Sequence, residues 1–203
     1  MTRLIALSLA LAVAGCASDP EVAPADAPVA VPVDEPTQPG ADVAVSPIGD
    51  GEVTGTVTFT ALDDALEIRY DLAGLAAGPH GFHVHDVGDC GPDSTGTPGG
   101  AAGGHFNPLE SPHGAPSAAP VDRHAGDLGN IEAGPDGRAS GVVVDSVLSL
   151  SGPTSVLGRS LMLHSGRDDL SSQPSGDAGG RVGCGVIRPA ALPDATLADS
   201  SGL

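Results

Sequence analysis

The sequence contains no lysine and no tryptophan, and only eight of its 203 residues are basic, all of them arginines. Against these stand 26 aspartates and glutamates, so the formal charge at neutral pH is −18. A nucleic-acid-binding surface needs clustered lysines and arginines, which this composition does not supply. Nucleic acid is therefore not an expected partner, and the charge favours a soluble protein of the cell envelope.

Aromatic residues are also scarce, at 2% of the chain, whereas glycine and proline number 30 and 19. This composition argues against a helical bundle and favours a turn-rich β architecture or disorder. The length accommodates one ordinary domain together with additional segments.

The apolar run from Leu4 to Ala14 is too short for a spanning helix and follows a single basic residue, Arg3. Both features are typical of a signal peptide, expected at residues 1–15. The run ends in VAGC, which resembles the bacterial lipobox, whose cysteine becomes the lipidated first residue. We therefore expect export and attachment through Cys16 to a membrane of the bacterial cell envelope, facing the periplasm or the cell surface. The alternative is ordinary signal cleavage that leaves Cys16 as a free thiol.

Cysteine occurs three times. With Cys16 assigned to lipidation, Cys90 and Cys184 remain, and an unpaired cysteine in an exported protein needs an explanation. Export places these two in an oxidising compartment, where a disulfide is the default.

Composition divides the remaining chain into three parts. Residues 16–50 are rich in proline, alanine and acids and lack basic residues, so they bury too little apolar surface to fold and are expected to form an extended tether. From residue 51 a period-two alternation predicts half-buried strands. The candidates are 53–59, 66–72, 80–86, 127–133, 139–147, 159–164 and 182–188. Glycine-rich stretches at about 87–123 and 165–181 are long enough to be functional loops, and residues 190–203 are expected to be a flexible tail.

All seven histidines fall between positions 80 and 164. His83 and His85 are two apart on a predicted strand, so their side chains leave the same face and can share one ion, although such a pair alone is more often structural. Three imidazoles and a carboxylate form a closed set that suits structural zinc: His105, His113, His124 and Asp127. Four imidazoles form a nitrogen set that suits copper: His83, His85, His105 and His164. The seventh, His80, is expected to have a structural hydrogen-bonding role.

The stretches GFHVHDVGDC, GGHFNP, RHAGDLGN and RVGCGVI resemble, in this order, the signature stretches of the copper/zinc superoxide dismutase family. The resemblance runs from about residue 51 to 189. It implies an all-β domain there, an eight-stranded Greek-key barrel or immunoglobulin-like sandwich with two long functional loops. The implied reaction is the disproportionation of superoxide to dioxygen and hydrogen peroxide with copper and zinc as cofactors, serving antioxidant defence in the cell envelope.

The same resemblance implies a role for each matched residue. His105 bridges the two metals and delivers a proton to the product, and Arg181 guides and hydrogen-bonds the anionic substrate. Asp168 links a copper-binding to a zinc-binding histidine, here His83 and His113. Cys90 and Cys184 form the family disulfide.

The sequence departs from the family in the second glycine-rich stretch. Relatives often place a steering lysine there, whereas this chain has Pro174 at about that place, with Arg167 as a partial substitute. Two other functions remain open: a non-catalytic envelope lipoprotein that buffers copper or zinc, and a structural β-sandwich with a vestigial site. A buffer has no use for Arg181, and the complete ligand sets argue against a vestigial site. Monomer and homodimer are also both left open.

Overall fold

The structure is a computed structural model that describes residues 39–191. The expected signal peptide, Cys16, most of the expected tether and all but the first two residues of the expected tail lie outside these described residues. Within them, no helix is long and apolar enough to cross a membrane.

The described part of the chain is built almost entirely of strands. In order they are β1 (Gly40–Pro47), β2 (Thr54–Ala61), β3 (Leu66–Ala73), β4 (Gly78–His85), β5 (Asp127–Ala133), β6 (Arg138–Asp145), β7 (Ser160–His164), β8 (Arg181–Val186) and β9 (Arg188–Pro189), with one short 3-10 helix, η1 (Gly100–Ala102). The seven strands expected from alternation all form, with ends within two residues of those predicted.

The first strand lies where the tether was expected, so the domain boundary at residue 51 is wrong. β1 begins at Gly40, and its alternating side chains Ala41, Val43 and Val45 are buried in the core. The burial of these side chains and the pairing of β1 with β2 offset the entropy lost when this segment becomes ordered, whereas the preceding proline-rich stretch has too few apolar side chains to do so. The period-two signal at 41–45 directly follows the proline-rich segment, whose composition masks it.

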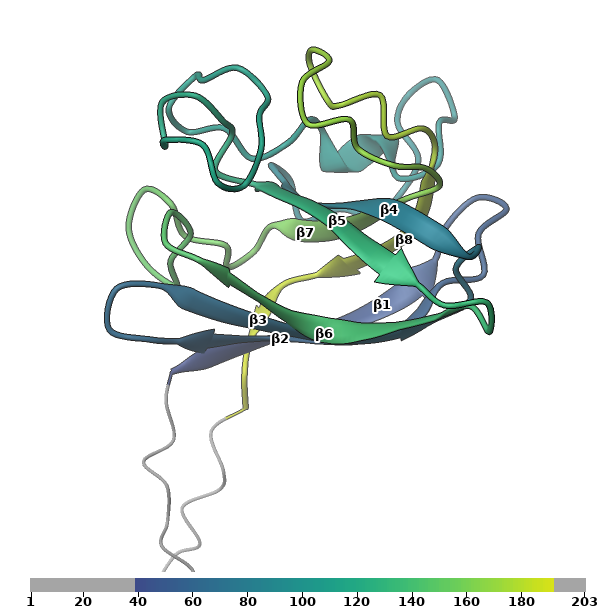
Figure 1. Cartoon of the computed structure of the whole chain (residues 1–203), viewed down its shortest axis with the longest axis horizontal. Coiled ribbons are helices and arrows are strands. Elements are labelled where there is room, and N and C mark those ends of the chain that lie inside the picture. The colour runs from purple at the N-terminus through teal and green to yellow at the C-terminus, as the bar shows by residue number, and fades with distance from the viewer. Residues whose placement is uncertain (1–38, 192–203) are drawn as a thin grey trace, which may run out of the picture. The chain divides into compact units, whose positions relative to one another are not determined.

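The strands form one antiparallel sheet that curls into a nearly closed barrel, which confirms the expected fold class. Eight strands follow the order β5-β4-β7-β8-β1-β2-β3-β6, and β9 adds to β1. Figure 1 shows two layers, with β1, β2, β3 and β6 in one and β4, β5, β7 and β8 in the other. The apolar core between them includes the fully buried side chains of Phe59, Ile68, Phe82, Leu161 and Ile187.

Two long connections leave the barrel, as expected, and lie over the layer that contains β4, β5 and β7 (Figure 1). The first, residues 86–126, contains η1 and joins β4 to β5. The second, residues 165–180, joins β7 to β8. We call them the first loop and the second loop. The barrel is thus a scaffold that holds both loops over one outer face.

Candidate metal centre

Two adjacent strands carry three of the clustered histidines on the outside of the barrel. His83 and His85 lie in β4 on either side of Val84, which packs in the core, so strand alternation directs both imidazoles outward. His164 is the last residue of β7, and the β7–β8 ladder changes register between Leu163 and His164. Such irregularities re-aim side chains beside functional sites.

His105 reaches the same place from the first loop through an isolated antiparallel bridge to His85. One ring nitrogen from each of four buried histidines then lies within 4.8 Å of the others, in the group His83, His85, His105 and His164. We call this the copper group. The other nitrogen of each ring has an oxygen neighbour: His83 Nε2 and Asp168 Oδ2 are 2.8 Å apart, His85 Nδ1 and Gly103 O 2.9 Å, His105 Nδ1 and Asp127 Oδ1 2.7 Å, and His164 Nδ1 and Gly179 O 3.3 Å.

The four remaining nitrogens are buried and have no hydrogen-bond partner among the described residues. A buried polar atom without a partner is unfavourable unless a ligand satisfies it. Burial, assisted by the neighbouring imidazoles, lowers the pKa of His164 to about 3 and that of His85 well below its usual value. Burial likewise lowers the pKa of His105 to about 4. These rings therefore present lone pairs at neutral pH, and imidazole donors suit copper.

A second group, which shares His105, surrounds the carboxylate of Asp127 at the start of β5. We call it the zinc group. Asp127 Oδ1 is 2.7, 3.0 and 3.1 Å from the Nδ1 atoms of His105, His113 and His124. Asp127 Oδ2 accepts hydrogen bonds from the backbone N–H groups of Gly114 and His124. Burial alone would raise the pKa of Asp127, but its imidazole partners outweigh burial and lower it far below its usual value.

Three imidazoles and one carboxylate form the donor set of a closed tetrahedral zinc site. His113 Nδ1 is close to Asp127 Oδ1 but is not aligned for a hydrogen bond with it, so this nitrogen is also unpartnered among the described residues. Burial lowers the pKa of His113, but the adjacent carboxylates of Asp127 and Asp168 prevail and raise it to about 9. Carboxylates that favour a proton on this ring also favour a divalent cation beside it. The residues present therefore fit both metals.

Asp168, in the second loop, connects the two groups. Its Oδ2 accepts from His83 Nε2 at 2.8 Å, and its Oδ1 accepts from His113 Nε2 at 2.9 Å. The backbone of Asp168 is held in turn by Asn130 of β5, whose side-chain amide donates to Asp168 O at 2.9 Å and accepts from Asp168 N–H at 2.8 Å. A carboxylate on the outer nitrogen fixes the orientation and tautomer of a ligand histidine.

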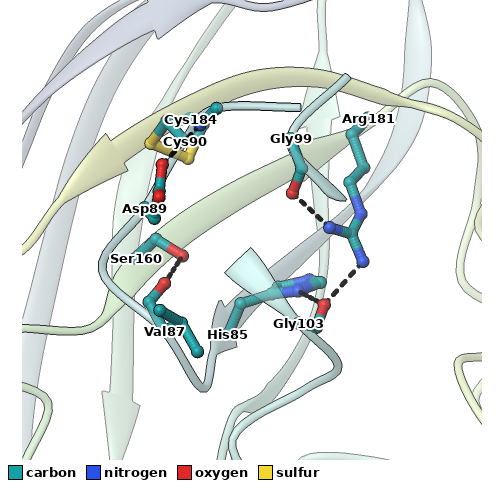
Figure 2. The surroundings of a disulfide bond; sticks show 10 residues. His85, Val87, Asp89, Cys90, Gly99, Gly103, Ser160, Arg181 and Cys184 are labelled. Carbon is teal, nitrogen blue, oxygen red and sulfur yellow. Dashed lines mark hydrogen bonds between the residues drawn. A yellow bond between two sulfur atoms is a disulfide. The ribbon is translucent and has the colours of Figure 1, made fainter. Parts of the chain in front are cut away.

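Arg181 lies beside the copper group, opposite His164 in the β7–β8 ladder. Its guanidinium donates to the carbonyl oxygens of Gly99 and Gly103, and Gly103 O also accepts from His85 Nδ1 (Figure 2). A cavity of about 390 Å³ opens here. Its lining includes Arg181, the rings of His85, His105, His124 and His164, and the second-loop residues Pro174 and Ser175. A fixed cation thus stands in the same cavity as the clustered imidazoles.

Cys90 and Cys184 form a disulfide, as expected, with Cα atoms 5.8 Å apart. The bond attaches the first loop to β8, three residues after Arg181 on the same strand. Figure 2 shows the disulfide and the Arg181 hydrogen bonds holding the same loop at separate points. Both contacts keep the Gly99–Gly103 carbonyls in place, and these in turn orient Arg181 and His85.

Three supporting side chains were not predicted from the sequence: Asn130, Gln173 and Arg123. Arg123 is buried, pairs with Asp145 and donates to the backbone oxygen of Asp127 at 2.7 Å. Its sequence neighbours, Asp122 and His124, do not indicate a partner 22 residues further on, and the only available signal is an arginine next to His124. His80 does have hydrogen-bond contacts, with its two ring nitrogens each 2.8 Å from a backbone oxygen, of His164 and of Ala76.

Known proteins are similar to this chain in sequence and in fold. The family model for copper/zinc superoxide dismutases matches residues 53–187. A Cu-Zn superoxide dismutase of Deinococcus radiodurans is 43% identical over 143 residues, which are 68% of this chain and 79% of that protein. Among solved structures, the crystal structure of the clock protein EA4 matches with a TM-score of 0.65 and 38% identity, over 75% of this chain and 95% of that one. The matched stretch carries both histidine groups, and this chain belongs to the copper/zinc superoxide dismutase family.

Proposed function

We propose that this protein disproportionates superoxide in the bacterial cell envelope, with the copper group and the zinc group holding the metals after which they are named. Superoxide dismutation with copper and zinc is the activity of the family to which the chain belongs. One observation carries the assignment of the site: the copper group presents four buried, unpartnered imidazole nitrogens, and three of its histidines, His85, His105 and His164, line the same cavity as Arg181. Metal analysis of the purified protein, together with its superoxide-decay rate, tests the proposal.

The chain's own residues have distinct tasks in the conversion of two superoxide ions and two protons to dioxygen and hydrogen peroxide. Bound copper supplies one-electron chemistry, and zinc has no redox chemistry of its own. Arg181 draws the anion into the cavity and orients it, because a planar, permanently charged guanidinium is a directional anion donor. His105 Nε2 holds and delivers a proton, since its Nδ1 stays directed at Asp127 in the zinc group.

The cavity favours turnover over storage. A protein that only buffered copper would need the four imidazoles and would gain nothing from an arginine facing the same space. Here Arg181 donates to two backbone carbonyls that hold it in place, so its charge is fixed before a substrate arrives. Fixed charge of this kind lowers barriers because no reorganisation is needed during the reaction.

The envelope location rests on sequence signals and on cysteine chemistry. The signal-like run, the lipobox-like VAGC and the acidic, proline-rich residues after it suit an exported lipoprotein. The Cys90–Cys184 disulfide is of a kind that persists in oxidising compartments. We infer that Cys16 carries the lipid and that the enzyme acts at the membrane to which the lipid attaches it.

Replacing Cys16 with serine tests the anchor. The variant is expected to appear as soluble exported protein or as unprocessed precursor, because serine offers no thiol for acylation. Fatty-acid labelling and membrane fractionation measure the change, and Ser18→Ala serves as the neighbouring control that keeps its lipid. Wild-type mature protein found in the soluble fraction with an unmodified Cys16 would contradict the anchor.

Charge around the cavity leads to a second test. Residues 39–191 contain seven arginines and nineteen acidic side chains, a formal charge of −12 without metals, so the overall field repels superoxide. Arg181 is the only arginine among the cavity-lining residues. Adding a cation at Ser175, which lines the same cavity, is expected to raise the rate roughly two- to tenfold at low salt through field focusing.

The rate of the Ser175→Lys variant is also expected to fall more steeply with salt, since exposed charges are screened beyond about 10 Å at 0.1 M. Pulse radiolysis across ionic strengths measures both effects, with Ser175→Gln as the neutral control of similar length. A steep salt dependence already in the wild type, unchanged by the lysine, would show that another cation attracts the substrate.

A further inference from the structure

Gln173 of the second loop pairs with the backbone of His113 of the first loop. Its side-chain Oε1 accepts from His113 N–H at 2.8 Å, and its Nε2 donates to His113 O at 2.9 Å. The amide thus pairs with both backbone groups of one residue, as a neighbouring strand would. Among the described residues, the Gln173 amide is the only hydrogen-bond partner of the backbone N–H and C=O of His113.

The ring of His113 is held between two carboxylates, whereas its backbone has no support from a strand or helix. Asp127 and Asp168 lie at opposite nitrogens of the imidazole, and the whole ring is buried. Its backbone lies in a segment without regular secondary structure, so no strand ladder fixes the Cα position. The Gln173 amide supplies the missing pair of backbone hydrogen bonds from across the site.

The same contact bears on the cavity wall. Pro174 and Ser175 follow Gln173 directly and line the cavity beside the copper group. Gly176, the next residue, packs so closely that a Cβ there would lie 1.8 Å from Asp168 Oδ1 and 2.6 Å from His113 Nε2. The two wall residues, Pro174 and Ser175, therefore lie between Gln173, which contacts the backbone of His113, and Gly176, which packs against its ring.

We propose that Gln173 is a positioning residue that sets both the place of His113 in the zinc group and the place of the Pro174–Ser175 wall. The proposal rests on the function assigned to the two histidine groups above. Zinc retention and anion access to the copper cavity would then both depend on one exposed side chain. Among the described residues, Gln173 forms side-chain hydrogen bonds with His113 and Ser171, and none with a copper-group ring or Arg181.

The test uses Gln173→Met, which keeps the length of the side chain and removes both hydrogen bonds. We expect zinc to pass from the fully loaded protein to a chromogenic chelator about tenfold faster, the effect of losing one or two net hydrogen bonds. We also expect the affinity for azide, read from the copper absorption band, to be about threefold weaker because the wall is less well placed. Gln173→Glu keeps only the acceptor and should release zinc at an intermediate rate.

Ser172→Ala is the matched control and should match the wild type in both measurements. Within residues 39–191, the Ser172 hydroxyl donates only to Asp169 of the same loop. Thermal unfolding of the metal-free proteins is the reference for overall stability, and Gln173→Met should unfold at a slightly lower temperature than Ser172→Ala because it lacks both hydrogen bonds to His113. A wild-type zinc release rate or azide affinity in Gln173→Met overturns the proposal, as does a change confined to metal-free unfolding. Wild-type protein that binds no zinc would instead refute the assignment of the zinc group.

Discussion

Replacing His105 with alanine is expected to remove copper and zinc together and to lower the dismutation rate by about three orders of magnitude or more. His105 is the one residue common to both groups, with Nδ1 2.7 Å from Asp127 Oδ1 and an unpartnered Nε2 in the copper group. Its loss therefore takes a donor from each ion and removes the proposed proton carrier. Metal content by mass spectrometry and the copper absorption spectrum measure the effect.

Two matched variants separate the groups. His164→Ala removes a copper-group ring that is absent from the zinc group, and His124→Ala does the reverse. Copper should fall selectively in the first and zinc in the second. The bridging assignment is wrong if His105→Ala retains both metals in full with an unchanged copper spectrum.

Replacing Arg181 with alanine is expected to leave both metals bound while the rate of superoxide decay falls by roughly 10- to 100-fold. The guanidinium is not a member of either donor group, so metal content should not depend on it directly. Its removal also leaves the carbonyls of Gly99 and Gly103 without this donor, at a cost of about 1–3 kcal/mol in stability. Activity per bound copper, rather than total activity, is therefore the quantity to compare.

Arg181→Lys distinguishes charge from hydrogen-bond geometry, because an ammonium keeps the charge but lacks the planar fork that reaches both carbonyls. Its rate should lie between those of the wild type and the alanine variant. Arg167→Ala is the control within the second loop, since Arg167 is exposed and does not line the cavity. Equal activity per copper in the wild type and Arg181→Ala would show that Arg181 does not guide the substrate.

Much of this architecture was predictable because its signals are local. Period-two alternation predicts the strands of the barrel, as in Leu66, Ile68 and Leu72. His83 and His85 are two residues apart, which places them on the same side of a strand. The family resemblance then indicated copper and zinc, which the family match confirms. The individual ligand roles stay predictions, now supported by the convergence of the two histidine groups.

The unpredicted parts depend on contacts between distant residues. The amide of Asn130 pairs with Asp168, and that of Gln173 pairs with His113, across 38 and 60 residues of chain. A single asparagine or glutamine creates no periodicity, and its backbone partner leaves no trace in the side-chain sequence. β1 differs from these contacts because its signal is local, but its alternation at 41–45 follows a long proline-rich stretch whose composition predicts a tether.

The position of β8 has a consequence for the order in which the protein folds. This strand, Arg181–Val186, lies between β7 and β1, so it joins the half that contains β4, β5 and β7 to the half that contains β1, β2, β3 and β6. Until it is inserted, both halves have an unpaired strand edge exposed, which is a site for aggregation. Barrels dominated by such long-range pairing fold in milliseconds to seconds. Barrel closure, and with it the placement of Arg181 and Cys184, therefore waits until the chain has been synthesised through residue 186, after all seven other barrel strands.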